Sequence, residues 1–183
     1  MVKAPIGKQD QYASTFGGFN LFSFNKDNVV VDMLDRDRER GEEITDHIVL
    51  FDTGIKRTKN LQERFKKLTA GQIETLDKIK GITHDALDRI FIQDYEGLGN
   101  LLDKAWRLKK RSNPVSTPQI DKIYRRGMDC GAWGGKLLGS GGGGYMIFMV
   151  DPRNREQFIA NMDIRAVDFS ICNNGLEIKD LTE

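Results

Sequence analysis

Cysteine is scarce in this sequence, with Cys130 and Cys172 the only two in 183 residues. Their separation is not that of a metal-ligand set, and so sparse a pair predicts free thiols in a reducing compartment. No apolar run approaches the length that spans a bilayer, and residues 1–5 lack the apolar core of a signal peptide. These absences predict a cytoplasmic protein with no membrane partner.

Net charge is nearly absent as well. The 28 Lys and Arg residues offset 27 Asp and Glu residues to leave +1, so no global field indicates nucleic acid or an anionic membrane. His47 and His84 have no neighbours in sequence that would make them metal ligands, and we predict no metal site. What remains, 39% hydrophobic and 30% charged residues, is typical of an ordinary globular protein with one good core, or one domain plus part of another.

The most informative feature present is the glycine cluster from Gly139 to Gly144, interrupted only by Ser140. Apolar runs at 136–138 and 145–150 flank it, which predicts two strands joined by a turn with almost no side chains. Glycine reaches positive φ without a Cβ penalty and admits a ligand or another backbone closely. Two interpretations remain open, a phosphate-binding row of N–H groups and a flexible hairpin turn. Neither the P-loop pattern nor the dinucleotide-binding pattern fits, because no Lys-Ser or Lys-Thr pair and no helix follows.

The order of elements indicates an α+β fold in which helices pack on one face of a largely antiparallel sheet. We expect a polar hairpin turn at 25–28 and a solvated loop over the charged run 35–41. Thr83 is predicted to cap one helix and Thr117-Pro118 to start another. Strands are expected at 21–24, 29–31, 48–51, 136–138, 145–150 and 167–172, and helices around 61–68, 73–79, 87–91, 98–106, 120–124 and 155–161.

A second informative segment surrounds Asp10. An isolated aspartate is most often a cap, a turn residue or a surface charge. Here neutral hydrogen-bonding side chains surround it, and Gly17-Gly18 ends the segment. The neighbouring polar residues are Gln9, Gln11, Tyr12, Ser14, Thr15 and Asn20. This density suits a polyol, and a carboxylate beside a hydroxyl can accept or orient its proton during phosphoryl transfer.

Together these segments resemble motifs of the GHMP family of small-molecule kinases, which includes galactokinase, homoserine kinase and mevalonate kinase. Residues 7–13 resemble the segment that carries the catalytic aspartate, and residues 135–144 resemble the third glycine motif. Within the family, the stretches 16–20, 106–110 and 119–124 are most similar to D-glycero-D-manno-heptose phosphate kinases. Fucose-type kinases share much of this pattern.

The resemblance implies ATP-dependent phosphorylation of a sugar or sugar phosphate, with ATP and Mg²⁺. It implies a catalytic-aspartate segment over 1–46, from the end of the N-terminal kinase domain, and a ferredoxin-like C-terminal domain over 47–183. Asp10 would be the catalytic residue. The implied substrate-binding residues are Gln9, Gln11, Tyr12, Gly17 and Gly18. The implied phosphate loop is Lys136, Gly139, Ser140, Gly141, Gly142, Gly143 and Gly144. The alternating pattern of a strand fits a surface residue at Lys136 equally well.

The sequence departs from the family in one respect. The Pro-x-x-x-Gly-Leu-x-Ser-Ser-like loop that binds ATP phosphates is not found here, nor is the usual magnesium-binding acid. We therefore expect a chain that is inactive alone and that forms a homodimer or pairs with a missing N-terminal half. The alternative is a non-catalytic module that binds a sugar or sugar phosphate. RNA binding ranks last, because the residues before Tyr145 lack the basic and aromatic signature of an RNA-recognition sheet. Trp106 is predicted to lie in the core.

Overall fold

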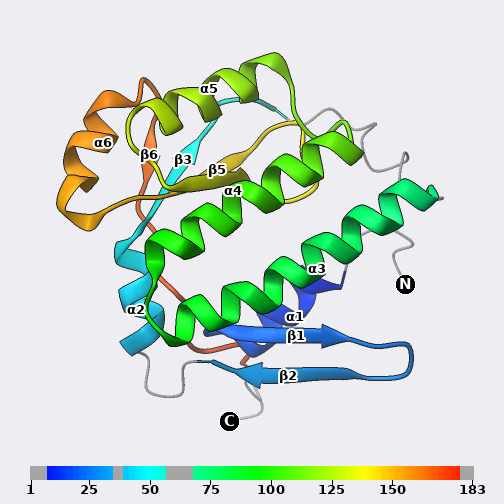
Figure 1. Cartoon of the computed structure of the whole chain (residues 1–183). Coiled ribbons are helices and arrows are strands. Elements are labelled where there is room, and N and C mark those ends of the chain that lie inside the picture. Colours follow the sequence, from blue (N-terminus) through cyan, green and yellow to red (C-terminus); the bar gives the residue numbers. More distant parts are fainter. Residues whose placement is uncertain (1–7, 35–38, 57–67, 178–183) are drawn as a thin grey trace, which may run out of the picture. The chain divides into compact units, whose positions relative to one another are not determined.

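The computed structural model describes residues 8–34, 39–56 and 68–177, and it divides into two compact units (Figure 1). The first unit comprises Met1–Asp46 and Phe169–Glu183, and the second comprises His47–Asp168. These units differ from the segments 1–46 and 47–183 that the resemblance implied, because residues 169–183 group with the first unit. Most of the expected helix at 61–68, and residues 35–38 of the charged run, lie outside the described residues.

The described part of the first unit contains a short helix on a hairpin. Helix α1 spans Gln9–Phe16, and strands β1 (Asn20–Phe24) and β2 (Val29–Met33) pair in antiparallel register with Phe22 opposite Val31. The turn closes where the Asn25 N–H donates to the Asn28 carbonyl at 2.9 Å. The predicted hairpin is therefore confirmed.

Helix α2, Glu39–Asp46, occupies the end of the run predicted to be a solvated loop. The helix is polar at most positions, but Gly41 and Ile44 are buried three residues apart, on one face. The alternating charges gave no sign of this buried face. The loop prediction is therefore wrong for residues 39–41, which belong to α2.

The second unit is built on a four-stranded antiparallel sheet in the order β4-β5-β3-β6. Its strands are β3 (Ile48–Asp52), β4 (Gly134–Leu137), β5 (Tyr145–Met149) and β6 (Ala166–Val167). With helices between β3 and β4 and between β5 and β6, this is the β-α-β-β-α-β arrangement of ferredoxin-like folds. The predicted α+β class is confirmed, although the last strand ends at Val167 rather than near Cys172.

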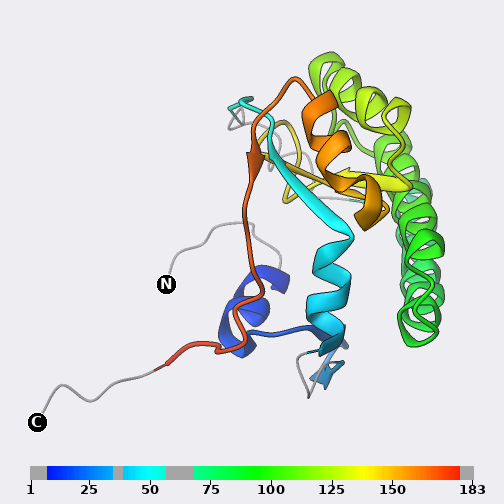
Figure 2. The same ribbon diagram turned by 90° about the vertical axis from the view of Figure 1, so that its left-hand side faces the viewer.

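Among the described residues of this unit, two long α-helices and two shorter ones accompany the sheet. Helices α3 (Ala70–Phe91) and α4 (Tyr95–Ser112) run side by side as an antiparallel pair (Figures 1 and 2), and α5 (Pro118–Asp129) and α6 (Arg155–Asn161) follow. The Thr117 hydroxyl accepts from the Ile120 N–H, so the predicted start of α5 is confirmed.

Thr83, in contrast, does not cap a helix. It lies inside α3, where its hydroxyl donates to the Ile79 carbonyl four residues earlier. The true cap is Thr69, which forms a reciprocal capping box with Gln72. Two consecutive apolar patterns belong to one continuous helix, which is why the sequence suggested a false start.

The core lies where α5 and α6 cover one face of the sheet. Phe51 and Phe148 on neighbouring strands pack edge-on against each other and against Phe158 of α6, and Tyr124 of α5 packs on Phe148. Trp106 of α4 is 2% exposed, which confirms its predicted place in the core. The side chain of Lys136 lies on the other face of the sheet. Residues paired across antiparallel strands share a face, and Lys136 pairs with Ile147, which alternates with the core residue Phe148 and pairs with Leu50.

The glycine turn, defined here as Gly139–Gly144, joins β4 to β5 and is packed rather than loose. Every glycine of the turn has a positive φ, from 73° at Gly139 to 151° at Gly143. A Cβ on Gly141 would lie 2.8 Å from Val115 Cβ, and one on Gly143 would lie 2.2 Å from the Ile55 carbonyl oxygen. Close backbone approach therefore requires glycine at these positions.

We expect Gly143→Ala to lower the free energy of unfolding by about 2 kcal/mol, because the added methyl group overlaps the backbone of Ile55. Gly81→Ala is the matched control, since a Cβ there meets nothing within 4 Å and lies inside α3. The control should raise the same free energy by about 1 kcal/mol. Urea unfolding followed by circular dichroism measures both, and equal effects would contradict the packed turn.

A second pair of variants tests the start of α3. Thr69→Ala removes the capping box and should lower the free energy of unfolding by about 1 kcal/mol. Thr83→Ala removes only an exposed hydroxyl within the helix and should leave it unchanged or slightly higher. The same unfolding assay compares them, and a larger loss in Thr83→Ala would restore a helix start at that residue.

Candidate functional site

Asp10 lies in the first turn of α1 and is exposed. Tyr12 and Phe16, one turn apart, face the hairpin, with the Tyr12 ring 6.0 Å from Phe22 and 5.3 Å from Phe24. Asp10 is two residues before Tyr12, a rotation of about 200° around the helix, so its carboxylate projects from the face away from these aromatic rings. The aromatic cluster thereby orients α1 and presents Asp10 to solvent.

The other residues of the predicted sugar site have mixed surroundings. Gln9 and Gln11 are exposed near Asp10, whereas Tyr12 is half-buried among aromatic rings. Gly17 ends α1 with φ 61°, and a Cβ there would lie 2.6 Å from Gly175 N. Tyr12 and Gly17 therefore have structural roles in the first unit whether or not they touch a ligand.

Residues 172–176 hold the end of α1 in place. The Gly18 N–H donates to the Cys172 carbonyl at 2.7 Å, and the Leu176 N–H donates to the Thr15 carbonyl at 3.0 Å. No motif in the sequence indicated that this distant segment would flank the Asp10 helix.

In the second unit, some backbone groups of the glycine turn form hydrogen bonds with other residues of the protein. The Gly142 N–H donates to the Val115 carbonyl and the Gly144 N–H to the Ile55 carbonyl, both at 3.0 Å. The Gly144 carbonyl accepts from the Thr53 hydroxyl at 2.5 Å. These two N–H groups are therefore not directed at a phosphate, and packing accounts for much of the glycine requirement.

Two lysines lie beside this turn. The Lys109 ammonium of α4 donates to the Gly139 carbonyl at 3.2 Å, and Lys136 lies on β4, three residues before Gly139. Both side chains are partly buried, and burial lowers the pKa of each. The charge of Lys136 lowers the pKa of Lys109 further. The sequence singled out Lys136 but not Lys109.

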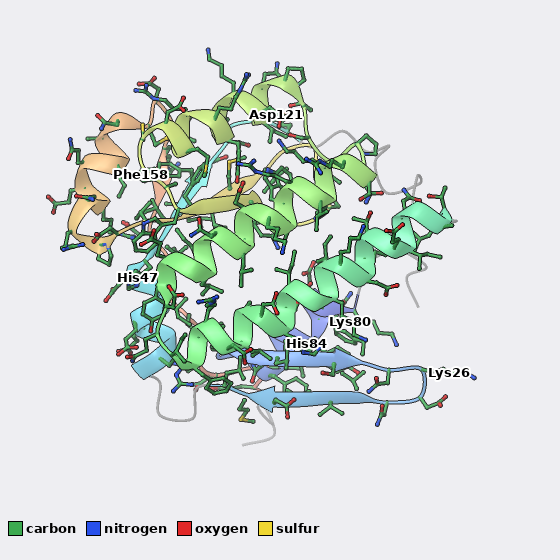
Figure 3. The ribbon with its side chains drawn as sticks, viewed as in Figure 1. Lys26, His47, Lys80, His84, Asp121 and Phe158 are labelled. Carbon is green, nitrogen blue, oxygen red and sulfur yellow. The ribbon has the colours of Figure 1, made fainter. Side chains whose placement is uncertain are left out.

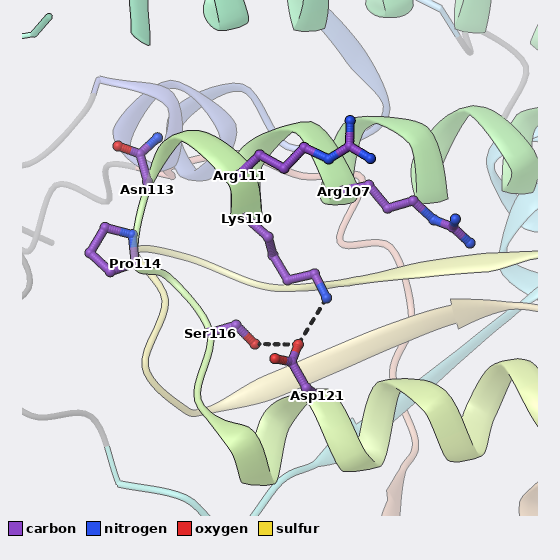
Figure 4. A pocket seen from close by; sticks show the side chains of 7 residues that line it. All are labelled: Arg107, Lys110, Arg111, Asn113, Pro114, Ser116 and Asp121. Atoms are coloured by element: carbon purple, nitrogen blue, oxygen red, sulfur yellow. Dashed lines mark hydrogen bonds and ion pairs between the residues drawn. The ribbon is translucent and has the colours of Figure 1, made fainter. Parts of the chain in front are cut away.

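A polar pocket lies between the end of α4 and the start of α5 (Figure 4). Its lining residues are Arg107, Lys110, Arg111, Asn113, Pro114, Ser116 and Asp121. Asp121 accepts from the Lys110 ammonium at 2.8 Å and from the Ser116 hydroxyl at 2.9 Å. Burial acts to raise the pKa of Asp121, but these hydrogen bonds outweigh it and lower the pKa. Within the pocket, this ion pair neutralises the charge of Lys110.

The described residues do not form a metal centre. They contain no group of three or more His, Cys, Asp or Glu placed to hold an ion, so they do not by themselves fit Mg²⁺. His47 and His84 lie well apart (Figure 3), and the His47 ring packs on Tyr95 at 4.2 Å. Within the same residues, no helix combines the length and apolarity needed to cross a membrane.

Comparison with known proteins supports the kinase resemblance. Residues 83–167 match the family described as GHMP kinases C terminal. The chain is 36% identical over 179 residues to D-glycero-alpha-D-manno-heptose 7-phosphate kinase of Campylobacter jejuni, which covers 93% of this chain and 53% of that protein. It is 30% identical over 132 residues to mevalonate kinase of Methanocaldococcus jannaschii, covering 67% of this chain and 42% of that one.

Solved structures agree. A D-glycero-D-manno-heptose 1-phosphate kinase from Bacteriodes thetaiotaomicron superposes with a TM-score of 0.66 at 26% identity, over 95% of this chain and 50% of its own. The chain thus spans about half the length of the relatives it matches. It therefore belongs to the GHMP kinase family, and its residues 83–167 carry the family's C-terminal domain.

Proposed function

We propose that the chain serves in ATP-dependent phosphorylation of a sugar or sugar phosphate, with a heptose 7-phosphate as the model substrate. The observation that carries this proposal is the 36% identity, over 93% of the chain, to a heptose 7-phosphate kinase. That similarity includes the glycine turn, since a match over 93% of the chain cannot leave out residues 139–144.

Asp10 is the proposed catalytic residue. Its exposed carboxylate on α1 would accept or orient the proton of the sugar hydroxyl that attacks the γ-phosphate of ATP. Gln9 and Gln11 would hydrogen-bond other hydroxyls of the sugar, and Tyr12, Gly17 and Gly18 would shape that part of the site.

The glycine turn and Lys136 are the proposed phosphate side of the reaction. The turn would let a phosphate-bearing ligand approach the backbone closely, and Lys136 would contribute positive charge. ATP would be the phosphoryl donor. Mg²⁺ would screen charge on its phosphates, although the described residues offer no cluster to hold the ion. The 183 residues also contain no Pro-x-x-x-Gly-Leu-x-Ser-Ser-like loop, and we expect no turnover unless such a loop is supplied.

A second candidate is a module that binds a sugar or sugar phosphate without turnover. The internal hydrogen bonds of Gly142 and Gly144 favour it, because these two donors are not available to an ATP phosphate. The two candidates share the sugar site around Asp10 and differ in whether phosphoryl transfer follows.

We expect heptose 7-phosphate to bind the chain, and Asp10→Asn to weaken this binding by roughly 10- to 100-fold, because a charge-assisted hydrogen bond is lost. Asp32→Asn, an exposed carboxylate on β2 of the same unit, is the matched control and should have no effect. Calorimetric titration measures both.

The same proteins are then assayed for ADP release from Mg²⁺-ATP across a panel of heptose phosphates and hexoses. Sugar-dependent release that falls by roughly 10²–10⁴-fold in Asp10→Asn would establish the kinase and disprove the requirement for a further loop. Binding without release is the result expected both of the second candidate and of a kinase chain that still needs an ATP-binding loop. If no sugar binds, both candidates are wrong.

A further inference from the structure

The two lysines beside the glycine turn come from α4 and β4, two elements that pack against each other, and both precede or contact Gly139 at the start of the turn. Lys109 is on the last full turn of α4, and Lys136 is on the face of β4 opposite the α5 and α6 layer. The hydrogen bond from Lys109 Nζ to the Gly139 carbonyl fixes the first ammonium at the entrance to the turn. One of its three N–H bonds is used there, which leaves two for a ligand.

Two neighbouring cations on α4 have acidic partners. Lys110 forms an ion pair with Asp121 at 2.8 Å, and its ammonium also lies 5.4 Å from the centre of the Tyr124 ring. Arg107 forms an ion pair with Asp103 at 2.8 Å. Among residues 8–34, 39–56 and 68–177, neither Lys109 nor Lys136 has a carboxylate within ion-pair distance.

An ammonium that is partly buried without a counterion costs free energy, and placing a second one beside it costs more. Such a pair is seldom retained for stability, because an apolar side chain would be more favourable in the same place. A bound anion removes the cost by supplying negative charge to both groups, as phosphate does with lysine. The pair therefore favours an anionic ligand over a structural role.

We propose that Lys109 and Lys136 together bind one phosphoryl group at the entrance to the glycine turn, with Gly139 holding Lys109 in position. This rests on the proposed function, which it deepens by adding Lys109 and by requiring a phosphorylated ligand at this point. The phosphoryl group comes either from the nucleotide or from a sugar phosphate, and the chemistry of recognition is the same for both.

Three lysine-to-methionine variants test this pair, since each removes one charge and keeps an unbranched apolar chain. Lys109→Met and Lys136→Met alter the proposed site. Lys104→Met is the matched control, an exposed lysine on the same helix as Lys109. Calorimetric titration with ADP, heptose 7-phosphate, unphosphorylated heptose and pyrophosphate gives the affinities, and thermal unfolding without ligand gives the stability.

Each site variant should weaken binding of pyrophosphate and of one organic phosphate by about tenfold or more, with no change in the control. A selective effect on ADP assigns the site to the nucleotide, and one on heptose 7-phosphate assigns it to the sugar. Binding of unphosphorylated heptose should not change. Without ligand, both site variants should unfold at a higher temperature than the unaltered protein, which a merely structural lysine would not produce.

Unchanged affinity for every phosphate in both variants would overturn the proposal, as would equal weakening in Lys104→Met. Lys109→Arg keeps the charge and should retain at least part of the pyrophosphate affinity, so a complete loss there would also count against an electrostatic role. The pyrophosphate titration involves neither a sugar nor turnover. It can therefore succeed where the kinase assay fails, and the two proposals fail separately.

Discussion

Backbone contact at the glycine turn is the constraint on which the second unit depends. The turn is held between Ile55, which follows β3, and Val115, which precedes α5, through hydrogen bonds from the N–H groups of Gly144 and Gly142. Because Gly144 also bonds to Thr53, the turn extends the pairing of β5 with β3 beyond the last strand residues. The turn therefore ties together three segments that are far apart in the sequence.

This constraint decides which groups remain for chemistry. The N–H groups of Gly142 and Gly144 hold the turn closed and are not available to a ligand. The turn therefore gives a ligand room to approach a fixed backbone, but not all of its N–H donors. The adjacent lysines supply what the amides do not, because Lys109 is held by the Gly139 carbonyl and Lys136 lies on the strand that enters the turn. In this account the glycines position the site and the lysines provide its charge.

Much of this architecture could be predicted from local pattern. Thr117-Pro118 specifies a helix start by itself, and the apolar runs around the glycine cluster specify β4 and β5. Prediction failed where distant contacts decide the outcome. Thr83 resembles a cap, but the packing of α3 along α4 carries one helix through it. The association of residues 172–176 with the Asp10 helix depends on backbone hydrogen bonds that no side-chain pattern reveals.

The same distinction applies to the candidate site. Asp10 and the glycines were found because each lies in a recognisable motif, whereas Lys109 looked like one more cation at the basic end of a helix. Only the fold distinguishes Lys109 from the next residue of α4, Lys110, which forms an ion pair with Asp121 of α5. The lack of a described acidic partner at Lys109, rather than residue type or burial, distinguishes the two lysines.

The most direct test of this account is amide hydrogen exchange at Gly142 and Gly144, measured by NMR in the free protein and in the presence of pyrophosphate. The account predicts that both amides are protected without ligand and that pyrophosphate leaves their protection unchanged, while resonances of Lys109 and Lys136 shift. Amides that exchange freely and become protected only when pyrophosphate binds would show that the turn itself is the phosphate cradle, and would contradict the central claim.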